Sequence, residues 1–100
     1  MQVDITYLQD KTLVRLEGRL DTSNVDQFQQ DIAPLMEINK PNIEIDCSGM
    51  TYTSSQGLRM FLILQKSVMS HGGKMVMVGM NPQVKEVFDI TGFSNIITIL

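Results

Sequence analysis

Two adjacent serines, Ser54 and Ser55, stand just before a dense apolar run and are the residues of this chain best placed for chemistry. A serine hydroxyl can attack a substrate, cap a helix or accept a phosphate. A serine hydrolase would carry its nucleophile in the pattern G-x-S-x-G and would need histidine and aspartate partners. Gly57 follows Ser55, but Thr53 stands where the first glycine belongs, so the pattern is incomplete.

The other reactive residues do not complete an active site with these serines. The only histidine, His71, follows Ser55 by about 15 residues, or some 22 Å along a helix that rises 1.5 Å per residue. Gly72, Gly73 and Lys74 look like part of a phosphate loop, but they end a predicted helix and open a strand, the reverse of the P-loop order. One histidine and one cysteine do not make a metal-ligand set. The sequence therefore predicts a protein that is not an enzyme and has no cofactor or metal.

Composition predicts one folded domain over residues 1–100. Of these, 43% are hydrophobic and 19% charged, which favours a globular protein over a disordered one. The net charge is −3 and the eight basic residues are scattered, so a nucleic-acid partner is not expected. The longest apolar run, at 60–64, is far too short to insert into a membrane, and the N-terminus lacks a signal sequence, so we expect a cytoplasmic location.

The first half of the chain predicts a hairpin, a helix and a strand. Val3, Ile5 and Tyr7 alternate with polar residues, and a second β-rich run, TLVRLEG, follows from residue 12. A helical apolar stripe starts after Ser23, with Asp21, Thr22 and Ser23 as candidate caps and with Val25, Phe28, Ile32, Leu35 and Met36 as the stripe. We expect Pro34 to disturb its last turn. A third strand is predicted at 43–47, where Cys47 alternates with two isoleucines and is expected to be a buried small hydrophobe.

The second half predicts two further helices, each followed by a strand. A mostly buried helix follows the serine pair and ends at His71-Gly72-Gly73. The apolar run KMVMVG fits a strand covered on both faces, Asn81-Pro82 starts a third helix, and NIITIL is the last strand. The order β, β, α, β, α, β, α, β predicts an α/β fold with a mixed, mostly parallel sheet, an antiparallel edge hairpin and helices packed against it.

Two alternatives stay open for the serines and for the helix that they precede. Ser54 and Ser55 could be only an N-cap and a loop residue, or Ser55 could be a phosphate acceptor at the positive end of the helix. Arg59, Lys66 and Ser70 mark an outward helix face, with Leu62 or Ile63 between them. This face is either the exposed side of a deeply packed helix or a patch that binds a partner.

Several motifs, in order along the chain, resemble the STAS domain family in its stand-alone form, the anti-sigma factor antagonists. These are GRLD at 18–21 before a helix, IEIDCSGMTYTSSQGLRMF with an apolar strand, a short loop and the S-S-x-G-L signature, and GGKMVMVGMNPQVKEVFDITGF with a strand and a proline-started helix. The resemblance runs from the first strand to the last and implies a STAS-like fold.

The resemblance also implies a function and site residues. The family is phosphorylated at the hydroxyl two residues before the signature glycine, which here is Ser55; Ser54 stands where the family usually has aspartate. The implied partners are an anti-sigma factor serine kinase, which binds the unmodified form and releases the phosphorylated one, and a PP2C-type phosphatase, so that partner switching regulates a sigma factor and its transcription. The implied partner-binding residues are Asp21, Thr22, Ser54, Ser55, Gln56, Gly57 and Arg59.

A second function remains possible at this point. The chain could be a non-switching STAS scaffold that docks to a transporter or to a stressosome-like complex. The C-terminal helix that is common in antagonists is not expected here, because the last predicted strand ends at Leu100. This feature favours the scaffold alternative.

Overall fold

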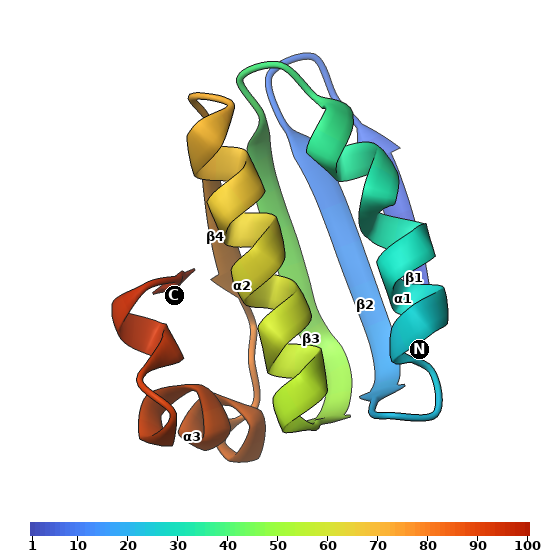
Figure 1. Cartoon of the computed structure of the whole chain (residues 1–100), viewed down its shortest axis with the longest axis vertical. Coiled ribbons are helices and arrows are strands. Elements are labelled where there is room, and N and C mark those ends of the chain that lie inside the picture. Colours follow the sequence, from blue (N-terminus) through green and yellow to red (C-terminus); the bar gives the residue numbers. More distant parts are fainter.

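The computed structural model describes residues 1–100 and contains one mixed five-stranded sheet, in the order β1-β2-β3-β4-β5 (Figure 1). The strands are β1 Gln2–Tyr7, β2 Thr12–Leu20, β3 Asn42–Thr53, β4 Lys74–Val78 and β5 Thr98–Ile99. The α-helices are α1 Val25–Ile32, α2 Ser55–Ser70 and α3 Pro82–Ile90, and the short 3₁₀ helices are η1 Ala33–Glu37 and η2 Phe93–Asn95. The predicted order of strands and helices is confirmed.

The predicted antiparallel hairpin forms one edge of the sheet. β1 pairs with β2 in antiparallel register, with Val3 opposite Leu16 and Ile5 opposite Val14. All other strand pairs are parallel. Parallel strands place their carboxyl ends at the same edge, so the segments that follow β2 and β3 meet there.

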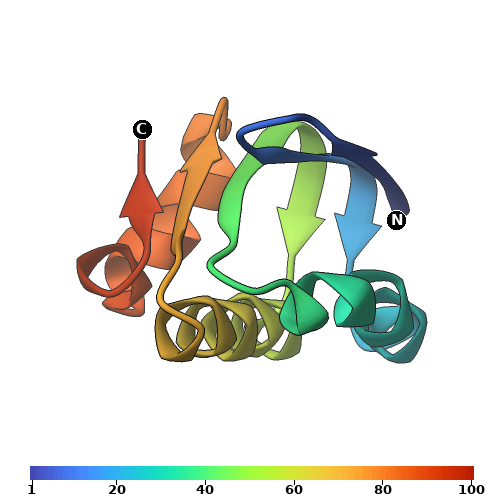
Figure 2. The same ribbon diagram turned by 90° about the horizontal axis from the view of Figure 1, so that it is seen from above.

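α1 and α2 lie on the same face of the sheet and enclose the core between helices and strands (Figure 2). The core contains 20 buried apolar residues. Phe61 of α2 lies at its centre: its ring centroid is 5.4 Å from that of Phe28 on α1 and 5.9 Å from that of Phe88 on α3. These aromatic contacts connect all three helices.

The third strand is much longer than the sequence predicts. A strand was expected at 43–47 and a short loop after it, but β3 continues to Thr53. The extra residues pair with the second half of β2, past two register shifts near Leu16 and Gly18. This extension carries β3 directly to the serine pair.

Two other predicted elements, the first helix and the last strand, differ in extent. α1 begins at Val25 after Asn24, not at Ser23, and changes into η1 at Ala33 because Pro34 cannot donate the backbone hydrogen bond of an α-helix. The last strand covers only Thr98–Ile99, since the residues before it form η2 and a turn.

In β4 the two methionines are buried, but Val76 and Val78 on the opposite face are only half-buried, so full cover on both faces is not observed.

Cys47 is fully buried in β3, as predicted. α2 ends at Ser70, and Gly72 follows in a left-handed conformation with φ of 73°. None of the helices combines the length and the apolar character that crossing a membrane requires.

Candidate functional site

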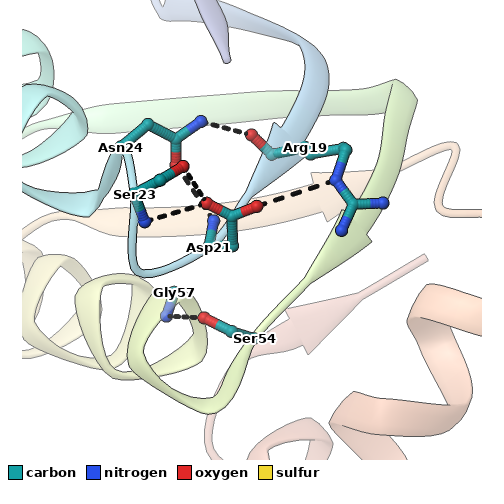
Figure 3. A network of polar contacts seen from close by, with 6 residues as sticks. All are labelled: Arg19, Asp21, Ser23, Asn24, Ser54 and Gly57. Atoms are coloured by element: carbon teal, nitrogen blue, oxygen red, sulfur yellow. Dashed lines mark hydrogen bonds and ion pairs between the residues drawn. The ribbon is translucent and has the colours of Figure 1, made fainter.

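The two serines have different positions at the start of α2. Ser54 is the N-cap: its backbone is extended, and its Oγ accepts a 3.2 Å hydrogen bond from the N–H of Gly57. Ser55 is the first residue of the helix and is exposed to solvent. The hydroxyl that caps the helix therefore belongs to Ser54 (Figure 3). The Ser55 hydroxyl takes no part in the capping interaction.

A backbone contact connects the start of α2 to the end of β2. The N–H of Ser54 donates a 2.9 Å hydrogen bond to the carbonyl of Leu20, and Leu20 is paired with Thr53 in the sheet. Asp21 follows Leu20, so its carboxylate lies at the same edge of the sheet as the serine pair (Figure 3). The signature serines and the aspartate, 33 residues apart in sequence, thus form one surface region.

Gly57 lets the first turn of α2 approach the sheet closely. It is buried, and a Cβ atom at this position would lie 2.5 Å from the Thr53 Oγ1 and 2.8 Å from the Leu20 Cγ. Real Cβ atoms do not come so close to their neighbours. Gly57 therefore shapes the site from inside rather than presenting a side chain to a partner.

Hydrogen bonds hold Asp21 in a tight turn before α1. Its Oδ1 accepts a 3.0 Å hydrogen bond from the N–H of Ser23 and a second bond from the Ser23 hydroxyl, while the Oδ1 of Asn24 accepts from the N–H of Asp21 at 2.9 Å. The bonds from Ser23 lower the pKa of Asp21, and the positive charge of Arg19 lowers it further. Asp21 is thus an anion fixed at the surface, although the sequence suggested a helix cap.

Arg19 connects this turn to the end of β3. Its Nε lies 3.6 Å from the Asp21 Oδ2, and its guanidinium lies over the ring of Tyr52, 4.5 Å from the centroid. The amide of Asn24 donates a 2.8 Å hydrogen bond to the carbonyl of Arg19 (Figure 3). Sequence reasoning did not select Arg19, Asn24 or Tyr52, although Arg19 is part of the GRLD motif.

A shallow groove runs between the first turns of α1 and α2. Its volume is about 230 Å³, and it is lined by Val25, Asp26, Gln29, Gln56, Arg59 and Met60. Two predicted site residues, Gln56 and Arg59, thus border the groove, and the α1 residues opposite them were missed. Their helical spacing marks α1 as amphipathic but does not show that its exposed side faces α2.

Thr22, the remaining predicted site residue, is exposed in the turn beside Asp21.

The outward face of α2 and the histidine after it lie away from Ser55 or are only partly exposed. Of the two aliphatic candidates on the outward face of α2, Ile63 is 42% exposed and Leu62 is half-buried. His71 lies beyond the last residue of α2, and its Nδ1 is 2.7 Å from the carbonyl oxygen of Ser67. The histidine is therefore at the opposite end of the helix from Ser55 and is not placed to activate it.

A family model settles which family this arrangement belongs to. The STAS domain model matches residues 2–100. The chain belongs to the STAS domain family. The predicted STAS-like fold is confirmed, and the S-S-x-G-L and GRLD motifs form one surface of this STAS domain.

Among curated proteins, the STAS domain is similar to the anti-sigma-B factor antagonist of Bacillus subtilis. The two are 26% identical over 99 residues, which cover 99% of this chain and 90% of the relative.

Among solved structures, an anti-sigma-factor antagonist (STAS) domain protein from Planctomyces limnophilus matches with a TM-score of 0.87 and 17% identity, over 97% of this chain and 87% of that one. The Bacillus cell fate determinant SpoIIAA in its phosphorylated form matches with a TM-score of 0.72 and 16% identity, over 99% of this chain and 91% of that one. At these identities, the structural matches show a common fold.

Proposed function

We propose that this STAS domain is an anti-sigma factor antagonist whose binding to an anti-sigma factor is controlled by phosphorylation of Ser55. The similar protein from Bacillus subtilis, which is matched over 90% of its length, is named an anti-sigma-B factor antagonist. A structural neighbour has been solved in a phosphorylated form. The first name favours an antagonist, and the second favours a domain that accepts phosphate, so together they favour a switch over a scaffold that docks permanently.

The observation that carries this proposal is the position of Ser55. It is the exposed first residue of α2, and the adjacent Ser54 caps the helix in its place. Modifying the Ser55 hydroxyl therefore breaks no hydrogen bond of the helix cap. The first backbone N–H groups of α2 favour negative charge at this point, so the folded domain tolerates a phosphate on Ser55.

The modifying enzyme in this proposal is the anti-sigma factor itself, acting as a serine kinase. The Ser55 Oγ attacks the γ-phosphorus of ATP, a new O–P bond forms, the bond to the leaving ADP breaks, and the hydroxyl proton passes to a general base of the kinase. A PP2C-type phosphatase reverses the change by hydrolysing the phosphoserine. Because the kinase step consumes ATP, the proposed cycle takes place in the cytoplasm.

Phosphorylation would act on the complex through charge. A phosphoserine carries about −1.5 to −2 charges at neutral pH. A unit charge about 5 Å from a partner carboxylate costs roughly 3 kcal/mol at an effective dielectric constant of about 20. Since about 1.4 kcal/mol changes affinity tenfold, one such contact weakens binding about a hundredfold before salt reduces the effect.

The proposal is tested with the purified chain and the anti-sigma factor of its own organism. Isothermal titration calorimetry measures the affinity, and incubation with ATP and Mg²⁺ followed by mass spectrometry locates the phosphate. We expect phosphate on Ser55, none in Ser55→Ala, and continued phosphorylation of Ser55 in Ser54→Ala.

A charge-matched pair of variants separates the switch from the scaffold. Ser55→Asp places a negative charge at the site, and Ser70→Asp places the same charge at the exposed far end of α2. We expect Ser55→Asp to weaken binding at least tenfold and Ser70→Asp to leave it within about twofold. Equal, tight binding by both variants would contradict the switch and support a permanently docked scaffold.

A further inference from the structure

Arg59 occupies the position on α2 from which an arginine can reach a group attached to Ser55. The two residues are four apart on the helix, and both are exposed. Side chains at this spacing are neighbours, with Cβ atoms about 5–6 Å apart. Long side chains on a helix lean toward its N-terminus, and an anion four residues before a cation is the more favourable order.

Arg59 is also the cation at this edge of the fold that has no ion partner. Arg19 is already held between the Asp21 carboxylate and the Tyr52 ring, whereas Arg59 forms no ion pair within the chain. Its side chain borders the groove between α1 and α2, across from Asp26. In the unmodified protein, Arg59 is therefore a free positive charge beside the groove.

We propose that Arg59 is the intramolecular counter-ion of the phosphate on Ser55, so that phosphorylation withdraws the guanidinium from the groove. This inference rests on the proposed modification of Ser55. A guanidinium can form two parallel hydrogen bonds to a phosphate. A lysine ammonium, which rotates freely and acts as a point charge, does not form this paired arrangement. The phosphate would then change the surface twice, by adding negative charge at Ser55 and by removing positive charge from the groove.

The test installs phosphoserine at position 55 by amber-codon incorporation, so that no kinase is needed. ³¹P NMR then follows the second ionisation of the phosphate as the pH is varied. If Arg59 pairs with the dianion, Arg59→Gln raises the pKa of the phosphate by about 0.3 unit, and Arg59→Lys raises it by less. The phosphorylated wild type and the Arg59 variants all contain the Asp21 and Asp26 carboxylates and the Arg19 guanidinium. The effects of these three charges on the phosphate pKa therefore cancel when the proteins are compared.

Lys66→Gln is the matched control for this measurement. It removes one positive charge from the exposed face of the same helix. Lys66 lies about 16 Å along the helix axis from Ser55, where salt screens its interaction with the phosphate. We expect its phosphate pKa to equal that of the phosphorylated wild-type protein. A phosphate pKa in Arg59→Gln that matches the Lys66→Gln value would overturn the proposal.

This outcome is independent of the outcome for the proposed function. If no anti-sigma factor phosphorylates Ser55 but the installed phosphate shows the Arg59-dependent pKa, the regulatory proposal fails and the Arg59 contact stands. If the kinase phosphorylates Ser55 but the phosphate pKa does not depend on Arg59, the switch stands and the proposed contact between Arg59 and the phosphate fails.

Discussion

The hydroxyl oxygen of Ser54 accepts a hydrogen bond from the N–H of Gly57, whereas the hydroxyl of Ser55, the next residue, makes no hydrogen bond to the helix and is exposed. The two neighbouring serines thus differ in the property that decides their roles. Ser54 stabilises the start of α2, and the hydroxyl of Ser55 is exposed to solvent, as the proposed phosphorylation requires. Substitutions can separate these two roles.

Ser54→Ala should destabilise the domain by about 1 kcal/mol, because the Gly57 N–H loses its capping acceptor. Ser54→Asp should keep nearly all of the stability, since aspartate also caps helices and its charge suits the N-terminus. Urea unfolding followed by circular dichroism measures both changes. Ser55→Ala serves as the control and should change the free energy of unfolding by no more than about 0.5 kcal/mol. A larger loss for Ser55→Ala than for Ser54→Ala would reverse the assignment of the cap.

Gly57→Ala should destabilise the domain even though alanine is the better helix former. The change gains up to about 1 kcal/mol of helix propensity, but the new methyl group would meet the Thr53 Oγ1 at 2.5 Å and the Leu20 Cγ at 2.8 Å. Overpacking of this kind costs about 1–3 kcal/mol, so after the helix-propensity gain a net loss of up to about 2 kcal/mol is expected in urea unfolding. Gln56→Ala, on the exposed side of the same turn, should be close to neutral. A stabilised Gly57→Ala would mean that the helix moves away from β2 without penalty.

The contribution of Asp21 to stability should disappear in acid. The pKa of Asp21 in the folded protein lies below its ordinary value of 3.8, chiefly because Ser23 donates to the carboxylate. A carboxyl group with a lowered folded pKa adds stability above its unfolded pKa and loses it as the pH falls through the folded pKa. The difference in urea midpoint between wild type and Asp21→Asn should therefore be constant near neutral pH and shrink below about pH 4.

Ser23→Ala provides the matching variant for Asp21. It removes the hydroxyl donor, so the carboxyl pKa should rise toward 3.8 in an NMR titration. An unchanged pKa in this variant would show that the backbone N–H of Ser23 and the charge of Arg19, not the hydroxyl, hold the pKa of Asp21 down.

Cys47 should be almost inert to thiol reagents while the protein is folded. Burial raises the pKa of its thiol to about 12, and the negative charge of Asp46 adds to the effect. At pH 8 only about one thiol in ten thousand would be ionised, and the side chain is not exposed. Ellman's reagent should release one equivalent of product in urea and almost none within minutes under native conditions. Ser70→Cys in a Cys47→Ser background should react at once, and equally fast reaction of the native Cys47 would refute its burial.

Much of the fold could be predicted because local patterns and global packing agree. The hairpin, the three helices, the order of the elements and the buried Cys47 all follow from alternation, helical stripes and glycine or proline signals. The end of β3 could not be predicted in this way. Its residues Ser48–Thr53 look like a loop in isolation, and they become a strand only because β2 offers a partner beyond two register shifts.

The positions of the proposed site residues at one edge of the fold could be predicted in part, but Arg19, Asn24 and Tyr52 beside them could not. The motifs indicated that Asp21 and Ser55 belong to one site, and the parallel pairing of β2 and β3 brings them together. Sequence alone could not decide which serine caps α2, because serine is common at several positions of a helix start. It also could not show that Asn24 is the N-cap residue of α1 and that its side-chain oxygen accepts from the N–H of Asp21, since both positions accept a short polar side chain.

The absence of a side chain at Gly57 has a consequence for the speed of regulation. With Leu20 and Thr53 directly against it, the first turn of α2 has no spare volume into which it could shift when its neighbour is modified. The backbone at the serine pair should therefore look the same before and after modification. In the proposed switch, a signal would therefore wait only for the kinase or phosphatase and for the dissociation of the complex, with no lag from a rearrangement of the domain itself.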